Sequence, residues 1–466
     1  MNSDTSPDWL LAKYAYELSY SDIDESARDH IAQMIFDVII ISIGAYNEKH
    51  GSGLINEDFN LKHNKSEEGS TLWSGRGKMP ANLAALCNGT WAEILDYQDV
   101  VVDPRNNGHL GVTIIPAAFA VAEREGSSGE ELITAIAAGL EVAIAVLRAV
   151  GRRHRSEGRG FRTTSIAGPL GASVACAKLL NLDIKQIAYT MGMAGACSPN
   201  GLMPSLAPGN GSFGMDKDWV NGQAAQLAVN SADLVKHGMT ASDRVVTGEM
   251  GIVASHSHGD GQELKVPKGG TPNISNISLK KYACCYGVHS AIEAAKAICI
   301  DKGINSDDID NVFVQVKADS AKTLSTRKIS NHMAARFSLP YAVALAVIKK
   351  DDISMHDFEE PAIFDQKIIQ MMERIEIIAD EDLTEFHVQT GGFPGKVEIV
   401  VGDIKYSERI DYPAGSSQRP MSWGDMGHKF AELTANHYSD EQRQKIITAG
   451  KEIPAVHDIN QFSKLL

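Results

Sequence analysis

Asp96 and Asp99 form the first of four polar clusters that interrupt otherwise apolar stretches of the chain, and Asn107-Gly108-His109 follows them. A helix that ends in two acidic residues, followed by a loop that presents a histidine at the start of the next helix, brings acid and base groups together. This arrangement predicts proton transfer at Asp96 and His109. The composition equally fits aspartates that only cap helix ends.

The second and third clusters each lie where a helix is expected to begin. Arg162 and Thr163 precede an Ala/Gly-rich helix, whose first backbone N–H groups, together with the guanidinium, form a carboxylate receptor. The alternative is a plain helix cap beside a solvated arginine. Lys217 stands at the start of another helix, where its charge opposes the helix dipole. We therefore expect an acidic side chain or a bound anion beside Lys217.

The fourth cluster runs from Lys280 through Tyr282 to His289 and leads into an apolar helix. His289 by itself is more typical of a hydrogen-bonded core histidine.

Two other patterns are weaker evidence for a functional site. The segment 209–214 has the GxGxxG spacing of dinucleotide sites, but prolines rather than a strand precede it. The pair His256 and His258 offers metal ligands, although its Gly-rich surroundings fit a solvated loop better.

The elements that must position these clusters are mostly helices. Apolar residues recur at helical spacing from about residue 26 to residue 240, and dense small residues between Gly168 and Ala177 permit close helix packing. The final stretches, 424–435 and 440–451, have the same helical character. We therefore predict a mainly α fold with a large all-helical domain built from both chain ends.

The middle of the chain has a different pattern. Strand-like alternation occurs at 311–317, 396–401 and 404–410, between further helical stretches. This mixture predicts a smaller α+β lid domain inserted into the helical one. We place the helical domain at residues 1–268 and 413–466, and the lid domain at residues 269–412.

Composition and charge limit the kinds of partner and the compartment that we expect for the protein. The net charge of −15 over 466 residues argues against general nucleic-acid binding. The first 12 residues lack the layout of a signal peptide, and the most apolar run, at 34–45, suits a core helix better than a membrane span. The six cysteines lie mostly in apolar surroundings, which predicts reduced thiols. We expect a cytoplasmic protein that binds neither nucleic acid nor membrane.

Taken together and in this order, the clusters resemble the MmgE/PrpD superfamily, whose members include dehydratases, decarboxylases and epimerases of small carboxylic acids. The resemblance extends from about Tyr20 to Phe430. It is carried by segments 81–90, 95–99, 108–109, 115–118, 138–142, 160–164, 168–172, 177–183 and 280–285, by His289, and by segment 419–421 ahead of Lys429.

The resemblance implies a helical domain with a smaller lid domain, a site between the two, a homodimer, and chemistry without a cofactor or metal. It implies that Asp96, His109 and Lys217 are catalytic, with Lys217 or His109 transferring a proton while Asp96 orients and tunes them. It also implies a set of substrate-binding residues, in which Arg162 and Lys280 hold carboxylates: Arg162, Thr163, Lys280, Tyr282 and His289.

Three positions depart from the family pattern. Gln98 replaces a usual aspartate, Val100 replaces a frequent threonine, and Arg162 replaces a common histidine. At the last position a permanent cation takes the place of a side chain that titrates near neutral pH. This exchange suits a substrate with an additional or differently placed carboxylate, or another reaction altogether.

The sequence therefore predicts a cofactor-independent lyase that acts on a small di- or tricarboxylic acid by moving a proton next to a carboxylate. The reaction would be 2-methylcitrate dehydratase-like or aconitate decarboxylase-like. One alternative is an isomerase that epimerises a dicarboxylate such as iminodisuccinate. A second alternative is a non-catalytic relative that only binds a small anionic carboxylate.

Overall fold

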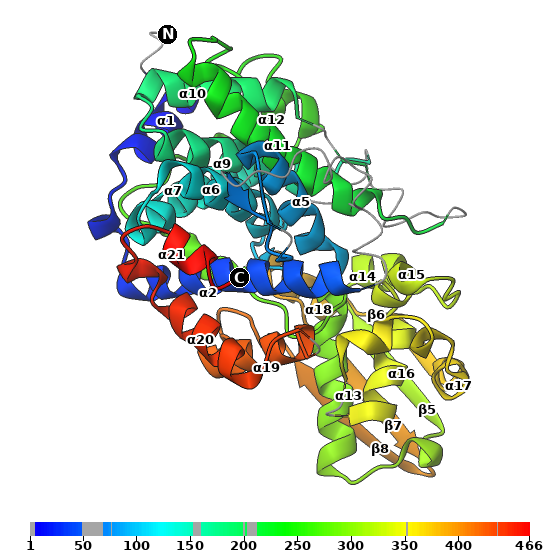
Figure 1. The fold of residues 1–466 in the computed structure, drawn as a ribbon. Coiled ribbons are helices and arrows are strands. Elements are labelled where there is room, and N and C mark those ends of the chain that lie inside the picture. Colours follow the sequence, from blue (N-terminus) through cyan, green and yellow to red (C-terminus); the bar gives the residue numbers. More distant parts are fainter. Residues whose placement is uncertain are drawn as a thin grey trace.

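The computed structural model describes residues 5–48, 69–75, 77–151, 160–198, 201–202, 212–350, 353–435 and 437–466. Helices dominate the described part of the first 256 residues and pack together in the upper body of Figure 1. They are α1 Pro7–Glu17, α2 Glu25–Asn47, α5 Ala81–Ile94, α6 Gly111–Glu125, α7 Gly129–Val150, α9 Thr163–Leu179, α10 Ile184–Ala196, α11 Asp216–Lys236 and α12 Ile252–His256.

The C-terminal helices return to the helical domain, as the sequence predicted. They are α19 Trp423–Leu433, α20 Asp440–Lys451 and α21 Asn460–Ser463. Both α19 and α20 pack against α2, and Figure 1 shows these red helices beside the blue one. Ser422 and Ser439 each form a capping box that satisfies the first amides of its helix. The prediction of a mainly α fold with a smaller α+β region is confirmed.

The α+β region lies at the lower right of Figure 1 and is built on a four-stranded sheet of order β6-β5-β7-β8. Strand β5 pairs parallel with β6 and antiparallel with β7, and β7 pairs antiparallel with β8. Helix α13 packs on β7 and β8 and on α16. The bounds are α13 His289–Asp301, β5 Asn311–Val316, α14 Ala318–Thr323, α15 His332–Arg336, α16 Leu339–Lys349, α17 Gln366–Met372, β6 Ile375–Ala379, α18 Glu381–Thr390, β7 Gly395–Val401 and β8 Ile404–Ile410.

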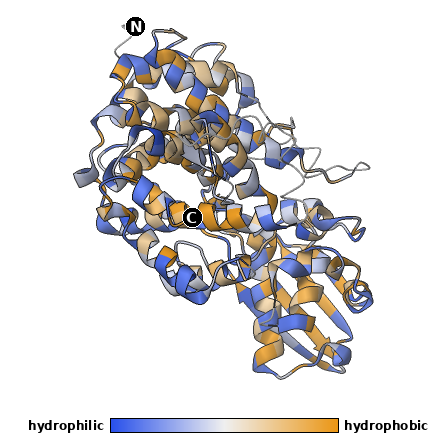
Figure 2. Cartoon of the chain, viewed as in Figure 1, coloured by the Kyte–Doolittle hydropathy of each residue, from blue (hydrophilic) through white to orange (hydrophobic). Residues whose placement is uncertain are grey.

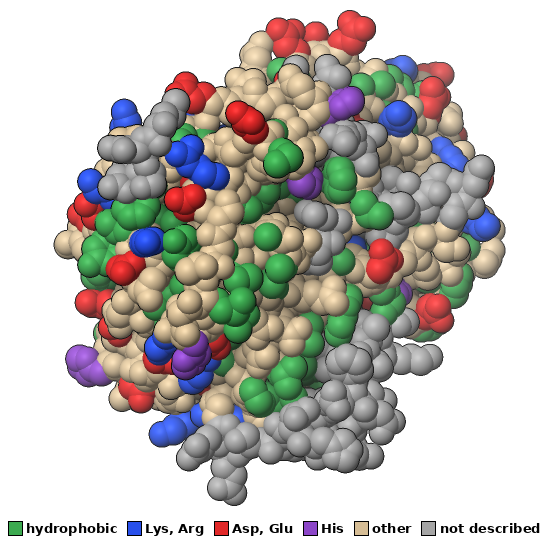
Figure 3. Space-filling view, turned by 90° about the horizontal axis from the view of Figure 1, so that it is seen from above, with side chains coloured by type: hydrophobic (Ala, Val, Ile, Leu, Met, Phe, Trp, Pro, Cys, Tyr) green, Lys and Arg blue, Asp and Glu red, His purple; other side chains and the backbone are tan. Residues whose placement is uncertain are grey.

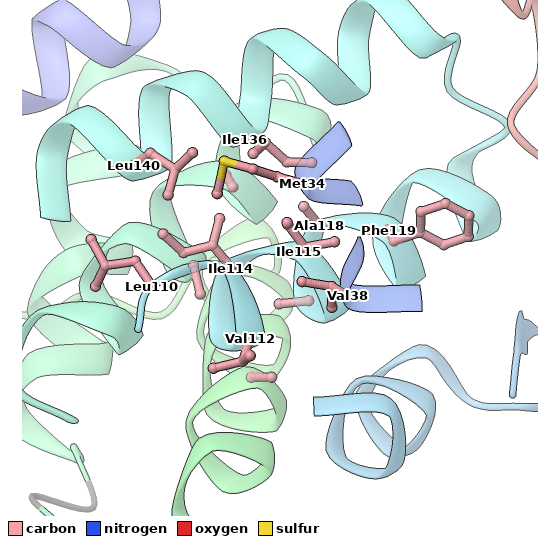
Figure 4. Packing of buried hydrophobic residues seen from close by; sticks show 14 of the residues in the cluster. Met34, Val38, Leu110, Val112, Ile114, Ile115, Ala118, Phe119, Ile136 and Leu140 are labelled. Atoms are coloured by element: carbon pink, nitrogen blue, oxygen red, sulfur yellow. The ribbon is translucent and has the colours of Figure 1, made fainter. Parts of the chain in front are cut away.

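Two hydrophobic clusters correspond to these two regions. The larger joins α2, α6 and α7, and Figure 4 shows Met34 of α2 between Ile136 of α7 and Ile115 of α6. The smaller contains the inward residues of the sheet, such as Val314 and Val397, with α13 and α16. Figure 2 shows the same division, because orange residues gather inside the helical body and again around the sheet.

Helices α2 and α7 are long and apolar enough to cross a membrane, judged by length and composition alone. Of their apolar windows, 83% and 94% are buried inside the protein. Buried core helices pass the same test, so the two helices are weak evidence for a membrane span. Figure 3 shows the helical body from above, with acidic and basic side chains interspersed between hydrophobic patches over the described part of this face.

Glycines allow two pairs of helices, α5 with α11 and α7 with α9, to approach each other closely. A Cβ atom on Gly222 of α11 would lie 2.1 Å from Thr90 Oγ1 and 2.3 Å from the Leu86 carbonyl oxygen of α5. Gly139 of α7 and Gly171 of α9 face each other in the same way, with distances of 2.5 and 2.4 Å to the opposite carbonyl oxygen. The close packing that the small residues predicted is therefore present.

Short ladders tie distant segments to the helical body. Strands β1 Ser70–Thr71 and β2 Lys78–Met79 pair with each other, and β3 Val100–Val101 pairs antiparallel with β4 Ile277–Ser278. Because β3 follows α5 closely and β4 precedes Lys280 by two residues, the second ladder brings Lys280 to the end of α5.

Candidate active site

A cavity lies between the helical domain and the α+β domain, and residues of both line it. One side of the cavity, which we call its floor, comes from the end of α5, the loop before α6, the first turns of α9 and α11, and Lys280 in the segment after β4. Its opposite side includes Tyr286, Lys317, Leu324, Phe337 and Phe393. The floor is strongly polar, whereas the opposite side combines aromatic and aliphatic side chains with Lys317, Asp319, Ser320 and Thr323.

Asp96 follows α5 in the left-handed conformation, with φ at +49°, which few residues other than glycine and Asn or Asp adopt. Lys280 Nζ donates to the Asp96 carbonyl oxygen at 2.7 Å and to Asp96 Oδ2 at 2.9 Å, and so stabilises this conformation. Burial raises the pKa of Asp96, but the charges of Lys280 and Lys217 outweigh burial and hold the pKa well below its usual range. Asp96 is therefore ionised.

Lys217 is the second residue of α11, and three acidic side chains lie close to it, where the sequence led us to expect one. Its Nζ lies 2.7 Å from Asp218 Oδ1, 3.2 Å from Glu93 Oε1 and 3.6 Å from Asp96 Oδ1. Burial lowers the pKa of Lys217, but these carboxylates outweigh it and raise the pKa above the ordinary value. Lys217 is therefore a fixed cation at neutral pH.

Glu93 is the central carboxylate of the floor, although the sequence analysis did not single it out. Its Oε1 lies 3.1 Å from Arg162 Nη2 and 3.2 Å from Lys217 Nζ, and its side chain is only 1% exposed. Burial raises the pKa of Glu93, but Lys217 and Arg162 outweigh it and leave the pKa below its ordinary value. Arg162 is also buried and donates to the Lys217 carbonyl oxygen at 2.8 Å, so it is not a solvated arginine.

His109 lies at the floor with a defined tautomer. Its Nδ1 is 2.6 Å from the Asp99 carbonyl oxygen, and since a carbonyl only accepts hydrogen bonds, Nδ1 carries the proton. Burial and the nearby charge of Lys280 lower the pKa of His109 to about 4. The imidazole is therefore neutral near pH 7, and Nε2 is the nitrogen that can accept a proton.

Asp99 has the capping role that was the alternative for both aspartates. Its Oδ2 accepts the backbone N–H groups of Leu110 and Gly111, at 3.1 and 3.0 Å, at the start of α6. Burial raises the pKa of this carboxyl to about 7. The two aspartates therefore have different roles: Asp99 caps a helix, and Asp96 belongs to the charged floor.

Arg162, which precedes α9, and the first two residues of α9, Thr163 and Thr164, line the cavity. Thr163 Oγ1 donates to the Asn107 carbonyl oxygen at 2.5 Å, and Thr164 Oγ1 accepts the His109 backbone N–H at 3.0 Å. These bonds hold the His109 loop against the start of α9. The first amides of any helix lack intrahelical partners, so this helix start can offer N–H groups to an anion.

Tyr282 and His289 are not among the residues that the described chain brings to the cavity wall. His289 is fully buried, with Nε2 3.3 Å from the Cys284 carbonyl oxygen and its ring centroid 5.2 Å from those of Tyr282 and Tyr286. Burial lowers the pKa of His289 to about 3. Of the eight predicted site residues, the structure brings together six around the cavity: Asp96, His109, Arg162, Thr163, Lys217 and Lys280.

Several lining residues come from the α+β domain and were not predicted. Cys285 and Tyr286 lie inside the fourth polar cluster, so their neighbours Lys280 and Tyr282 were the available signal. Lys317 ends the predicted strand 311–317, but nothing in its local sequence marks it as a site residue. Phe393 had no signal at all, because it lies in the short connection before β7.

The described part of the structure gives no support to the two weaker sequence patterns, the possible metal ligands His256 and His258 and the glycine pattern at 209–214. Among the described residues, no group of three or more His, Cys, Asp and Glu side chains is placed to hold a metal ion. His256 ends α12 and packs against Phe161, with ring centroids 4.9 Å apart. Of the glycine pattern, residues 209–211 lie outside the described residues. All six cysteines are described and none of them is in a disulfide bond, with Cys197 exposed and Cys285 half-buried.

Comparison with curated proteins finds distant relatives. The chain is similar to the mitochondrial 2-methylcitrate dehydratase of Yarrowia lipolytica (24% identity, 53% of this chain and 50% of that one). It is similar to an alkylcitrate dehydratase of a fungal species (25% identity, 51% and 49%). It is also similar to the cis-aconitate decarboxylase of Aspergillus terreus (26% identity, 94% and 91%). The match thus spans about half the length of the two dehydratases.

Family models cover most of the chain. The model of the MmgE/PrpD N-terminal domain matches residues 10–265, which contain most of α1, all of α2 through α12 and most of the floor. The model of the MmgE/PrpD C-terminal domain matches residues 282–453, which contain the sheet and the return to α19 and α20. The chain therefore belongs to the MmgE/PrpD family.

Proposed function

We propose that this protein is a lyase that dehydrates or decarboxylates a small tricarboxylic acid by moving a proton at a carbon next to a carboxylate. The observation that carries the proposal is the position of His109. A neutral imidazole whose Nδ1–H is fixed on the Asp99 carbonyl lines the same cavity as the Asp96, Lys217 and Lys280 charges. The names of the relatives, two dehydratases and a decarboxylase, support this reaction class.

His109 is the proton-transferring group in this proposal. In a dehydration, Nε2 takes a proton from carbon while the hydroxyl group leaves and is released as water with a proton from solvent. In a decarboxylation, Nε2 first takes a proton from solvent and gives it to carbon after carbon dioxide has left. A pKa of about 4 in the ligand-free protein is low for this task. Bound carboxylates add negative charge beside the imidazole and raise its pKa toward neutrality. The substrate itself thus adjusts the base.

Lys217 is not the base in this proposal, because its raised pKa keeps it protonated. As a fixed cation beside Asp96 and Glu93, it stabilises negative charge that develops on the substrate. Neither dehydration nor decarboxylation of this kind transfers a hydride, so the proposed reaction does not call on a redox cofactor. The departure at Arg162 fits the same picture, since Arg162 and Glu93 form part of the charged floor.

The carboxylate next to the reacting carbon binds at the start of α9. Thr163 and Thr164 offer the first amides of the helix, and the Arg162 guanidinium lies beside them. Helix starts favour anions through these amides and through the helix dipole. A carboxylate held there lies close to His109, because the His109 backbone N–H bonds to Thr164 Oγ1.

The test is incubation with 2-methylcitrate, citrate or cis-aconitate in deuterated water, followed by NMR and by detection of carbon dioxide. Loss of water or of carbon dioxide supports the lyase. Deuterium uptake without either loss makes the protein an isomerase instead, and no reaction with any of the three acids contradicts the proposal.

The variant His109→Asn tests the base directly. Its amide nitrogen can still donate to the Asp99 carbonyl, so the loop is retained while Nε2 is lost. We expect turnover to fall by about 10²- to 10⁴-fold, the usual contribution of a general base. The exposed His428→Asn serves as the matched control and should retain full turnover.

A further inference from the structure

Four cationic side chains line the described cavity wall, and three of them belong to the floor. Arg162, Lys217 and Lys280 each form an ion pair with a carboxylate, and every side chain in these pairs is at most 5% exposed. Breaking a buried ion pair leaves an uncompensated charge and is strongly unfavourable. A substrate carboxylate cannot readily displace these internal partners.

Lys317 has a different kind of partner. It follows β5 in the α+β domain, and its Nζ lies 3.2 Å from Asp319 Oδ2. The Lys317 side chain is only 9% exposed, whereas that of Asp319 is 55% exposed. Ion pairs with a solvated partner contribute little to stability, because water competes for the charge. An anion entering the cavity can therefore replace Asp319 at low cost.

The surroundings of Lys317 fix the ammonium group at the cavity. Its Nζ lies over the Phe393 ring, 5.4 Å from the centroid, and Phe393 also lines the cavity. Attraction between a cation and an aromatic face restricts where the ammonium can lie. The position is across the cavity from the floor, since Lys317 comes from the other domain.

We propose that Lys317 binds a second carboxylate of the substrate, which displaces Asp319, and that this exchange selects acids with two or more carboxylates over monocarboxylates. The inference rests on the proposed function for the nature of the ligand. One carboxylate then lies at the start of α9 and another on the α+β domain, so the substrate spans the two domains. Lys317 is a specificity-determining residue in this arrangement.

Binding of tricarballylate tests the inference without turnover, because this tricarboxylate has no hydroxyl group to eliminate. Isothermal titration calorimetry on Lys317→Met should show a dissociation constant raised about 10- to 100-fold, as expected for the loss of a charge-assisted hydrogen bond. Asp319→Asn should lower it, because the competing carboxylate is gone. Butyrate, a monocarboxylate, should bind all three proteins alike.

Lys322→Met is the matched control, since Lys322 is an exposed lysine of helix α14, which begins directly after Lys317. It should bind tricarballylate like the wild type, and thermal midpoints should show that every variant is folded. An unchanged dissociation constant in Lys317→Met overturns the inference, and so does weaker binding in Asp319→Asn or no binding to the wild type. Lys317-dependent binding without turnover of any acid leaves the inference standing and contradicts only the proposed function.

Discussion

Glu93 joins Arg162 and Lys217 at the floor, so its charge compensates two buried cations at once. The variant Glu93→Gln keeps the size of the side chain and removes the charge. We expect a loss of about 3–5 kcal/mol in the free energy of unfolding, the usual effect of breaking a buried ion pair. Denaturant titration measures it.

Asp233→Asn is the control for Glu93→Gln. Asp233 pairs with Arg124 at 2.8 Å, but the two side chains are 33% and 30% exposed. We expect a loss of only about 0–1 kcal/mol, because solvent screens this pair. Equal losses in the two variants would show that the floor network contributes no more than a surface pair.

The pKa of His109 gives a second prediction at the scale of single residues. Burial and Lys280 depress it to about 4, so kcat/KM should fall as the pH is lowered through about 4, where the base of the free enzyme becomes protonated. Lys280→Met removes the cation, and NMR titration of the ligand-free variant should show the pKa of His109 moved upward. An unchanged pKa would contradict the assigned role of Lys280.

The same shift affects stability. The pKa of an unfolded histidine is about 6.5, above the folded value of about 4. Between these two pH values the unfolded chain binds the proton more readily, so the contribution of His109 to stability is lost as the pH falls through this window.

The residue types of the floor could largely be predicted from the sequence, but their pairing could not. Glu93 lies three residues before Asp96, a spacing that would place both on one helix face if the helix continued, although α5 ends at Ile94. This was the signal available for it. Tyr282 and His289 occur in the right motif, yet the turn at Tyr286–Val288 and the start of α13 carry His289 into the core. Local sequence does not determine such side-chain directions.

The contact between α5 and α11 is the element-scale feature on which the floor depends. Gly222 lets α11 lie against Thr90 and Leu86, and this contact sets Lys217 against Glu93. Gly222→Ala should push the helices apart and cost about 1–3 kcal/mol, as overpacking usually does. Turnover should fall as well, because Lys217 moves relative to Asp96.

Gly427→Ala is the control for this prediction. Gly427 lies inside α19, where a Cβ atom would meet only the end of the Ile447 side chain at 3.4 Å. Alanine favours the helix by up to about 1 kcal/mol over glycine, so this variant should be neutral or more stable. A Gly222→Ala protein with unchanged stability and activity would show that the close contact does not position Lys217.

Most elements could be predicted from hydrophobic periodicity, and the failures have physical causes. The strands at 311–317, 396–401 and 404–410 were found within a residue of their ends. Strand β6, Ile375–Ala379, was missed, since a short strand that pairs in parallel with β5 is stabilised mainly by its neighbours. The start of α11 was expected at Lys217, which is its second residue. Of the carboxylates that compensate its charge, Asp218 is the next residue in the chain, whereas Glu93 and Asp96 are distant in sequence and could not be predicted.

Lys429 connects three parts of the molecule that are far apart in sequence. From α19, its Nζ pairs with Asp37 of α2 at 2.7 Å and donates to the carbonyl oxygens of Tyr97 and Lys280, at 2.9 and 3.1 Å. Tyr97 directly follows Asp96 in the chain, and the side chain of Lys280 forms the ion pair with Asp96 in the floor. The helical pattern at both chain ends could predict that they share one domain, but no local pattern could predict these partners.

Lys429→Met should therefore affect both the fold and the floor. It leaves Asp37 as an unpaired buried charge, which we expect to cost about 3–5 kcal/mol, and it removes the donor that holds the Lys280 main chain. Adding Asp37→Asn removes the unpaired buried charge. The loss in the free energy of unfolding of the double variant should therefore be smaller, by at least about 0.5 kcal/mol, than the sum of the losses in the two single variants.

Turnover should stay low in the double variant, because the Lys280 carbonyl still lacks its donor. The exposed pair Lys445–Glu441 supplies the control, and Lys445→Met should be nearly neutral. Strict additivity, or full activity in Lys429→Met, would show that the C-terminal helices only cover the core and do not position the site.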